Sequence, residues 1–453
     1  MTHHVEITGQ SASDIADSVR TLIDRGHLRP GDLLPPVRTL ARDLGVNRNT
    51  TVAAYRLLAA SGLVVGQGRA GTRVADLSPG PQDGYATDGA DDTSVQTVDL
   101  ANGNPLPTLI PDLRPALTAA AGHTVLYGEP VVDAGLAQWA REWFAPDVPG
   151  AAGDSGTPGA LELSVTSGAV DAIERLLAQS LMRDDAVGLE DPCFLASQQT
   201  VRLGGYRTVP IAVDERGMTP AGLRVALEAG VRAVVCTPRA QNPTGASINA
   251  ERAQQLREVL ADYPYVLVIE DDYYSLLSRV PFESIVGPEH QRWALVRSLS
   301  KFIGPDICVA LVASDRETAS RLALRLSPGT TWVSHLLQRI ALAQLTNTDA
   351  RALIERAAGV YAANNAAFVR ALAERGVDAL AGDGISVWVP VKAPATEVAA
   401  RLARHGWTVR PGDEFGLTEG GTASHHIRVT VHELSESQVE AFVTDLVVAG
   451  GYA

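Results

Sequence analysis

The spacing of apolar residues in the N-terminal part of the chain predicts three helices and a hairpin. Residues 11–25 carry apolar side chains at helical spacing, which is typical of an amphipathic helix. Gly45 ends a second, shorter helix, and Asn47 is suited to cap a third that stops near Gly62. Two short apolar runs then flank the glycine-rich segment 66–71, and this pattern predicts a β-hairpin.

Three helices followed by a hairpin are the elements of a winged helix-turn-helix, which binds double-stranded DNA by placing its third helix in the major groove. Residues at the start of that helix face base edges, and here they are Asn47, Arg48, Asn49 and Thr50. Arg38 and Arg69 would contact DNA phosphates. The same periodicity fits a small helical domain with ordinary surface arginines, so the pattern alone leaves both interpretations open.

The hydrophobic pattern stops after the hairpin. Residues 77–97 are polar and acidic, and no cationic side chain occurs between Arg73 and Arg114. This composition predicts a flexible linker, which for about twenty residues has a typical end-to-end distance of about 25 Å. The chain is therefore expected to divide into a small domain over residues 1–76, the linker, and a large domain over residues 98–453.

In the large domain, apolar runs typical of buried strands alternate with helical patterns. The runs cover residues 161–165, 186–190, 206–211, 232–236, 266–270, 294–297 and 308–313. This alternation predicts an α/β domain with a mixed, mainly parallel sheet, whose ligands gather at the carboxyl ends of the strands. After Arg316 the pattern changes to long helices and then to short strands near 385–391 and 427–431, which indicates a smaller α+β lobe.

The composition narrows the class of protein. With 453 residues, the chain is long enough for two or three domains. The net charge is −14, but residues 1–76 carry nine arginines against seven acids, so a nucleic-acid partner would meet this segment. Three cysteines provide neither a disulfide framework nor metal-ligand spacing, and no metal is expected. The lack of a membrane-spanning apolar run and of a signal-peptide pattern favours the cytoplasm.

Only two lysines occur in the chain, and one of them, Lys301, has neighbours that suggest chemistry. It follows the apolar run 293–296 and two serines, Ser298 and Ser300. A desolvated lysine at a strand end can form a Schiff base with an aldehyde. Pyridoxal 5'-phosphate (PLP) is the aldehyde cofactor that needs such a lysine, together with hydroxyls for its phosphate and an acid for its ring nitrogen. An isolated lysine is more often a solvated surface residue, so the other parts decide the interpretation.

Candidates for those other parts follow neighbouring predicted strands. Gly168 and Ala169 open a helix, so backbone N–H groups there could hold a phosphate. Asn242 could donate a hydrogen bond to a phenolic oxygen. Asp271 could keep a pyridine nitrogen protonated, and Tyr273, two residues further on, could bind the same phenolic oxygen as Asn242. Together these residues predict a PLP site at the carboxyl edge of the sheet.

Both domains resemble known families. In the small domain, residues 33–41 (LLPPVRTLA) and 71–74 (GTRV) resemble the gntR family of bacterial DNA-binding domains. In the large domain, residues 237–245 (TPRAQNPTG) and 298–306 (SLSKFIGPD) resemble fold-type I aminotransferases, and this resemblance extends from about residue 98 to the C-terminus. The combination resembles the MocR-type transcriptional regulators, and the motifs are most similar to the subgroup linked to vitamin B6 metabolism.

The aminotransferase resemblance implies a role for each candidate residue. The cofactor-binding residues would be Lys301 as the Schiff-base lysine, Asp271 at the pyridine nitrogen, Asn242 and Tyr273 (or its neighbour Tyr274) at the ring hydroxyl, Phe194 stacked on the ring, and Gly168, Ala169 and Ser298 at the phosphate. Taken alone, an aromatic residue such as Phe194 is more often part of the core. Arg428 would bind the carboxylate of an effector. Tyr127 would reach the cofactor phosphate of the other subunit, which implies a homodimer.

One position departs from the pattern of the family. In the subgroup a phosphate-binding arginine stands seven positions after the lysine, and this chain has Cys308 there. The loss of a charge-assisted contact is expected to weaken PLP binding by about 1.5–3 kcal/mol. A weakened site suits a sensor of the PLP level, and it also fits a site that has degenerated.

Three functions are compatible with the sequence. The first is a PLP-responsive DNA-binding regulator, in which PLP, alone or joined to an amino compound, changes how the two winged helices of a dimer meet DNA. The second is a working aminotransferase that carries a DNA-binding module. The third is a structural dimer that has lost its cofactor. The combination of motifs favours the first.

Overall fold

A computed structural model describes residues 6–66, 71–75, 97–148, 161–327, 331–418 and 420–452. The chain forms two compact units, Met1–Gly80 and Pro81–Ala453. Arg69 and nearly all of the predicted linker lie outside the described residues. In the parts of the chain that the structure describes, no helix is both long enough and apolar enough to cross a membrane.

The N-terminal unit consists of three helices and an antiparallel hairpin, as the apolar pattern predicts. Its elements are α1 (Ala12–Asp24), α2 (Val37–Leu44), α3 (Arg48–Ala60), β1 (Val64–Gly66) and β2 (Thr72–Val74). Gly45 ends α2 in the left-handed conformation, with φ 66°. The Asn47 side chain caps α3 by accepting a hydrogen bond from the Asn49 N–H at 2.8 Å. Ile15, Val19 and Leu58 are fully buried in the shared core.

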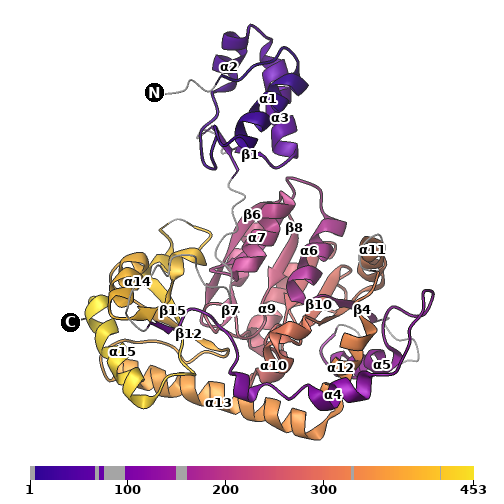
Figure 1. Cartoon of the computed structure of the whole chain (residues 1–453), viewed down its shortest axis with the longest axis vertical. Coiled ribbons are helices and arrows are strands. Elements are labelled where there is room, and N and C mark those ends of the chain that lie inside the picture. Colours follow the sequence, from indigo (N-terminus) through magenta and orange to yellow (C-terminus); the bar gives the residue numbers. More distant parts are fainter. Residues whose placement is uncertain are drawn as a thin grey trace. The chain divides into compact units, whose positions relative to one another are not determined.

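An eight-stranded sheet forms the centre of the second unit (Figure 1). Its strands, in spatial order, are β4 (Glu162–Thr166), β11 (Ala310–Ser314), β10 (Trp293–Ser298), β9 (Leu267–Asp271), β8 (Val231–Cys236), β5 (Ala186–Asp191), β6 (Arg207–Asp214) and β7 (Gly217–Met218). β11 is antiparallel to both of its neighbours, β4 and β10, and β7 is antiparallel to β6, whereas the other neighbouring strands are parallel. The prediction of a mixed, mainly parallel α/β sheet is confirmed.

Helices cover both faces of this sheet. Consecutive residues of a strand point to opposite faces, so each strand contributes apolar side chains to both cores. Ala233 and Val235 of β8 pack on one core, whereas Val234 and Cys236 pack on the other. The first core is covered by α6 (Ala169–Ser180), α7 (Leu195–Gly204) and α11 (Arg316–Leu326), and the second by α4 (Arg114–Ala120), α5 (Ala134–Phe144), α8 (Pro220–Glu228), α9 (Ala250–Leu260) and α12 (His335–Thr346). The core therefore holds the strand ends in fixed positions.

A smaller lobe follows the long helix α13 (Thr348–Ala373). It has an antiparallel sheet of β12 (Ser386–Pro390), β15 (His426–Thr430) and β14 (Arg410–Pro411), with α14 (Ala395–Arg404) and α15 (Glu436–Ala449). β13 (Trp407–Thr408) pairs with β3 (Val98–Asp99), so the start of the second unit joins this lobe. Short elements complete the unit, namely α10 (Ser300–Ile303), η2 (Pro107–Leu109), η3 (Ser275–Leu277), η4 (Pro305–Ile307), η5 (Gly412–Glu414) and η6 (Thr422–His425).

Candidate functional site

The register of the large sheet brings the candidate residues to one edge. Thr166 of β4 lies opposite Ala310, and Ala310 lies opposite Ser298 of β10. Asp271 of β9 lies opposite Val296, also in β10. The carboxyl ends of β4, β10 and β9 are therefore level with one another, and the segments that follow them extend from the same edge.

Lys301 lies in α10, directly after β10, and its side chain reaches back to the start of the second unit. Its Nζ atom donates a hydrogen bond to the Gly103 carbonyl oxygen at 2.9 Å. Gly103 adopts φ 64°, and a Cβ there would come within 3.3 Å of an Arg428 nitrogen. Lys301, Asn242, Tyr273 and Arg428 line one cavity, to which residues 383–386 of the small lobe also contribute. The cavity thus lies where the large sheet meets the small lobe.

Asp271 has the properties that a pyridine nitrogen requires of its partner. The residue is 4% exposed, and its Oδ1 atom is buried without a hydrogen-bond partner among the described residues. Burial, and then the charge of Asp272, raise the pKa of Asp271 to about 7. An unsatisfied buried carboxylate is costly, and a ligand that brings a proton to it removes that cost. The buried carboxylate of Asp271 therefore fits the protonated ring nitrogen of PLP.

Asn242 and Tyr273 are held by contacts on either side of the cavity. Arg428 donates from Nη1 to the Asn242 side-chain oxygen at 3.1 Å, which orients the amide with its nitrogen as the donor end. The Tyr273 hydroxyl donates to the Ala240 carbonyl oxygen at 2.7 Å. A ligand oxygen that took the Tyr273 proton would replace this bond. Tyr274, in contrast, is 1% exposed and belongs to the core.

Arg428 places a buried positive charge at the small-lobe side of the cavity. It lies in β15 and is 1% exposed. Its Nη2 donates to the Ala101 carbonyl oxygen at 2.7 Å, and its guanidinium lies 5.0 Å from the centre of the Phe415 ring. These contacts leave little freedom to the guanidinium. A buried and preorganised arginine of this kind suits the recognition of a carboxylate.

The predicted phosphate-binding loop has the expected shape and an unexpected acid. Gly168 precedes α6 with φ 89°, and Ala169 begins the helix. The Ser298 hydroxyl oxygen accepts a hydrogen bond from the Ser300 N–H at 3.3 Å. The Asp171 carboxylate accepts a hydrogen bond from the Ser167 N–H at 3.1 Å. An acid in the first turn favours the helix but repels a phosphate, and here the ion pair of Asp171 with Arg175, at 2.6 Å, offsets part of that repulsion.

Cys308 lies directly against this loop. Its Sγ atom is 3.4 Å from the Ser167 carbonyl oxygen, and a Cβ on Gly168 would be 3.4 Å from the same sulfur. Cys308 is exposed and has φ 46°. A side chain at position 308 therefore has both access to the loop and room towards solvent.

Replacement of Cys308 by arginine is expected to tighten PLP binding by about one to two orders of magnitude, because it adds a charge-assisted contact to the phosphate. The left-handed backbone costs arginine no more than cysteine, since both carry a Cβ. The dissociation constant can be measured by titrating the protein with PLP. Cys308→Gln, of similar length but without charge, is the control. Equal affinity in the two variants, or weaker binding in Cys308→Arg, would show that the phosphate does not gain from a cation here.

The other predicted residues, namely Asp271, Gly168, Ala169, Ser298, Phe194 and Tyr127, are not among the residues that line the cavity with Lys301. Phe194 precedes α7 and is half-buried. The Tyr127 side chain is 93% exposed, and its ring packs edge-on against Trp332 with 5.6 Å between ring centres. Its exposure is compatible with a role across a subunit interface.

The predicted DNA-contacting residues lie at the start of α3 and on α2. Arg48 and Asn49 are exposed, Thr50 is half-buried, and Arg38 is exposed on α2. Asn47 is exposed as well, but its side-chain oxygen is used for the cap of α3. Arg48 and Asn49 are therefore the stronger candidates for contacts with base edges.

Sequence reasoning missed the residues that build the Asn242 loop. Gln241 donates from Nε2 to the Pro192 carbonyl oxygen at 2.7 Å and accepts from the Thr244 hydroxyl at 2.6 Å. The same Nε2 lies 3.3 Å from the Glu190 carboxylate, and burial raises the pKa of Glu190 to about 7. The one available signal was an acid at the end of an apolar run, since such a position is usually buried.

Comparison with known proteins agrees with this architecture. Residues 96–446 match the family described as aminotransferase class I and II, and residues 11–74 match the bacterial regulatory proteins of the gntR family. The fold of the second unit is that of a kynurenine aminotransferase from Pyrococcus horikoshii, with a TM-score of 0.68 and 20% identity over 79% of this chain and 92% of that one. It is also that of LysN from Thermus thermophilus, an α-aminoadipate aminotransferase, with a TM-score of 0.66 and 22% identity over 79% and 92% of the two chains.

Among curated proteins, the chain is similar to two-domain regulators. It is 42% identical to the vitamin B6 salvage pathway transcriptional repressor PtsJ of Salmonella typhimurium over 97% of this chain and 98% of that protein. It is 26% identical to the probable rhizopine catabolism regulatory protein MocR of Rhizobium meliloti over 57% of this chain and 55% of that protein.

The fold and the matches define a bacterial regulator of the gntR type with an aminotransferase-like domain. More closely, the chain belongs to the MocR-type transcriptional regulators. The predicted family and fold are confirmed.

Proposed function

We propose that this regulator responds to PLP and controls genes of vitamin B6 metabolism. The observation that carries the proposal is the buried Asp271, whose Oδ1 lacks a hydrogen-bond partner among the described residues and which ends β9 beside the strand that leads to Lys301. The 42% identity to a repressor named for vitamin B6 salvage supports the metabolic assignment. The three regions proposed are a DNA-binding domain over residues 1–76, a linker over 77–97 and a PLP-binding domain over 98–453.

The chain's own residues would bind and orient the cofactor. PLP supplies an aldehyde and a ring nitrogen that can share a proton. Lys301 provides the amine for the Schiff base, and Asp271 holds the proton at the ring nitrogen. Asn242 donates from its amide nitrogen, whose orientation Arg428 fixes. Arg428 would bind the carboxylate of an amino compound, if one acts as a co-effector.

The position of the cavity offers a way for binding to alter the protein. Lys301 and Tyr273 follow strands of the large sheet, whereas Arg428 and Ser386 belong to the small lobe, and all four line the cavity. A ligand that contacts both sides favours the arrangement in which they are close.

We also propose that the protein acts as a homodimer in the cytoplasm. The exposed ring of Tyr127 would then complete the phosphate site of the partner.

The proposal is tested by measuring DNA affinity as a function of PLP. A duplex can be obtained by selecting random DNA with the full-length protein, and its binding measured by fluorescence anisotropy. PLP is expected to change the dissociation constant by about 5-fold to 150-fold, the usual size of coupling between two sites. Visible absorbance in the same samples reports occupancy. An unchanged DNA affinity at full occupancy would reject the regulatory response, and an absence of PLP absorbance would reject the cofactor.

A catalytic aminotransferase is the second candidate, and the position of Arg428 in the cavity with Lys301 favours it. The measurement is the formation of a 2-oxo acid from L-amino acids in the presence of PLP and a second 2-oxo acid. Repeated turnover with no change in DNA binding would establish the enzyme instead of the sensor.

In the DNA-binding domain, Arg48→Ala is expected to reduce sequence discrimination, whereas Arg38→Ala is expected to reduce DNA affinity in general. Arg48 precedes the exposed Asn49 at the start of α3, so its loss should weaken the selected duplex by about 1–3 kcal/mol more than random DNA. Arg38 lies on α2 and should contact phosphate, so its loss should weaken both duplexes alike. Arg69, the other predicted phosphate contact, should behave as Arg38 does. Competition binding at two salt concentrations checks this, and equal losses on both duplexes for Arg48→Ala would contradict it.

A further inference from the structure

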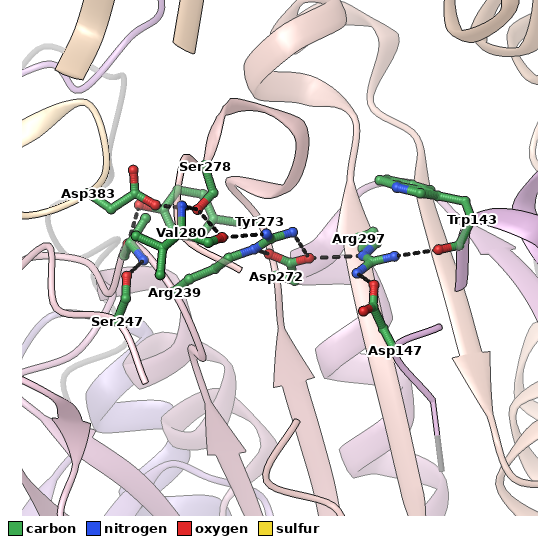
Figure 2. A network of polar contacts seen from close by, with 11 residues as sticks. Trp143, Asp147, Arg239, Ser247, Asp272, Tyr273, Ser278, Val280, Arg297 and Asp383 are labelled. Atoms are coloured by element: carbon green, nitrogen blue, oxygen red, sulfur yellow. Dashed lines mark hydrogen bonds and ion pairs between the residues drawn. The ribbon is translucent and has the colours of Figure 1, made fainter. Parts of the chain in front are cut away.

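The buried carboxylate that follows Asp271 in the sequence joins Arg297 of β10 to Arg239, which lies after β8 (Figure 2). Asp272 is fully buried, and Arg239 binds it with two hydrogen bonds, from Nε at 2.7 Å and from Nη2 at 2.9 Å. Arg297 donates to the same carboxylate from Nε at 2.9 Å. Bonds between guanidinium groups and a carboxylate are strong and directional, so the three side chains fix one another's positions.

The network is closed at both ends by groups outside these strands. Arg297 also binds the Asp147 carboxylate, and its guanidinium lies 4.6 Å from the centre of the Trp143 ring. Arg239 donates from Nη1 to the Val280 carbonyl oxygen at 3.0 Å. Two arginines are thus balanced by two carboxylates. The balance matters because a buried charge without a partner is strongly destabilising.

Each of Arg239, Asp272 and Arg297 lies within four residues of a cofactor-site residue in the sequence. Arg239 precedes Asn242 by three residues, after β8. Asp272 immediately follows Asp271, at the end of β9. Arg297, in β10, precedes Lys301 by four residues. The carboxylate of Asp272 therefore connects the ends of the three strands from which Asn242, Asp271 and Lys301 extend.

A second contact connects two of these segments at the cavity itself. Tyr273, which follows Asp272, donates to the carbonyl oxygen of Ala240, which follows Arg239. None of Asp272, Arg239 and Arg297 lines the cavity, so their effect on a ligand is indirect.

We propose that Asp272, Arg239 and Arg297 form a positioning triad that sets the mutual placement of Asn242, Asp271 and Lys301 and, through it, the affinity for PLP. The inference rests on the proposed cofactor site and identifies what holds that site in shape. A site of this kind requires its binding groups to be held by a supporting layer of hydrogen bonds, and small displacements cost affinity.

The triad also acts on Asp271 through charge. Although burial raises it, the pKa of Asp272 is lowered overall by its bonds with Arg239 and Arg297, so this carboxylate is ionised. Its charge is one of the two causes that raise the pKa of Asp271. If Arg239 is removed, less of the Asp272 charge is neutralised, and Asp271 keeps its proton to a higher pH. The pH dependence of cofactor binding therefore reports the triad.

The same unit contains a matched ion pair away from the cavity. Arg252 binds Asp214 with two hydrogen bonds, from Nη1 at 2.9 Å and from Nη2 at 2.8 Å. It also donates to the Met218 carbonyl oxygen at 2.8 Å. The side chain of Arg252 is 3% exposed, compared with 11% for Arg239. Arg252 is therefore a structural arginine of the same type without a neighbour in the cofactor site.

The experiment compares Arg239→Gln with Arg252→Gln in the full-length protein, and adds Arg239→Lys and Arg252→Lys as milder pairs. Urea unfolding without PLP gives the structural cost of each change. Visible titration gives the dissociation constant for PLP, and repeating it from pH 6 to pH 9 gives the pH profile. Arg239→Gln is expected to weaken PLP binding by about tenfold or more and to move the pH profile upward, and Arg239→Lys to show a smaller change in the same direction. Both Arg252 variants are expected to bind PLP as the unmodified protein does.

The outcomes separate the possible failures. Wild-type affinity and an unmoved pH profile in the Arg239 variants would overturn the triad while leaving the PLP site intact. Equal weakening in the Arg252 variants would overturn it as well, because the effect would then follow from general destabilisation. If Arg239→Gln does not fold, the two lysine variants decide by the same comparison. Failure of the unmodified protein to bind PLP would instead reject the proposed function itself.

Discussion

Lys301→Ala is expected to abolish the visible absorbance that PLP gives when it is bound to the protein, and to leave no adduct that borohydride can fix. The reason is that the amine at this position would be the covalent attachment point of the aldehyde. The folded protein should persist, because the hydrogen bond that this side chain donates to the Gly103 carbonyl oxygen is worth only about 1.5–3 kcal/mol. Absorbance spectra and urea unfolding of the same samples check both parts.

The chain offers a matched control in its second lysine. Lys392 places its Nζ 4.6 Å from the centre of the Tyr452 ring, outside the residues that line the cavity. Lys392→Ala should keep both the absorbance and the reducible adduct. Because the chain has only these two lysines, a digest of the reduced protein should carry the modification on the peptide with Lys301. Modification confined to Lys392 or to the N-terminal amine would contradict the assignment.

The N-terminal domain could be predicted because its signals are local. Gly45 ends α2 in a conformation that glycine adopts without strain, and the Asn47 side chain caps α3 by accepting a hydrogen bond from the N–H of Asn49, two residues further on. Such signals depend on a few consecutive residues and survive in any tertiary context. Arg69 shows the limit of this reasoning, since its role is inferred from the winged-helix geometry and it lies outside the described residues.

The large sheet was predictable for a different reason. Buried strands are continuous apolar runs, and each of the seven predicted runs overlaps an observed strand. The antiparallel direction of β11 was missed, because direction depends on pairing partners that are distant in the sequence. The two-residue strands β3 and β13 were missed because two residues contain no periodicity.

The residues of the candidate site also divide into those that the sequence predicts and those that it does not. Lys301, Asn242, Tyr273 and Arg428 could be selected from residue type and position after strands, and the fold brings them to one cavity. The arginines that hold Asp272 could not be selected, because a charged residue in the sequence gives no sign that it is buried against a partner from another strand. The position of Asp171 at the phosphate loop was missed for the same reason.

Asp271→Asn is expected to have opposite effects on stability and on cofactor binding. An asparagine cannot pair with a protonated pyridine nitrogen as a carboxylate does, so PLP binding should weaken by about 1.5–3 kcal/mol. Without PLP, however, the same change should stabilise the protein at alkaline pH. The cause is the pKa of Asp271, which is raised to about 7 by burial and then by the charge of Asp272.

The sign follows from linkage between proton binding and folding. A carboxyl group whose pKa is raised on folding contributes stability that is fully present below its ordinary pKa of 3.8 and is lost as the pH rises through about 7. Asparagine does not ionise, so Asp271→Asn escapes this loss. The free energy of unfolding of the variant, relative to the unmodified protein, should therefore increase by about 2–4 kcal/mol between pH 4 and pH 8. Glu190 and Glu270, whose pKa values are also raised to about 7, are present in both proteins and cancel in the comparison.

The adjacent aspartate provides the control with the opposite sign. The pKa of Asp272 is lowered on balance, because bonds with Arg239 and Arg297 outweigh its burial. Its stabilising contribution is therefore present at neutral pH and is lost only in acid. Asp272→Asn should destabilise the protein at pH 8, because it leaves two buried arginines without their shared carboxylate. Urea unfolding at pH 4 and pH 8, with PLP titration at pH 8, measures all of these quantities. If Asp271→Asn destabilises the protein as Asp272→Asn does at pH 8, or binds PLP with unchanged affinity, then Asp271 is a structural carboxylate and not the partner of the ring nitrogen.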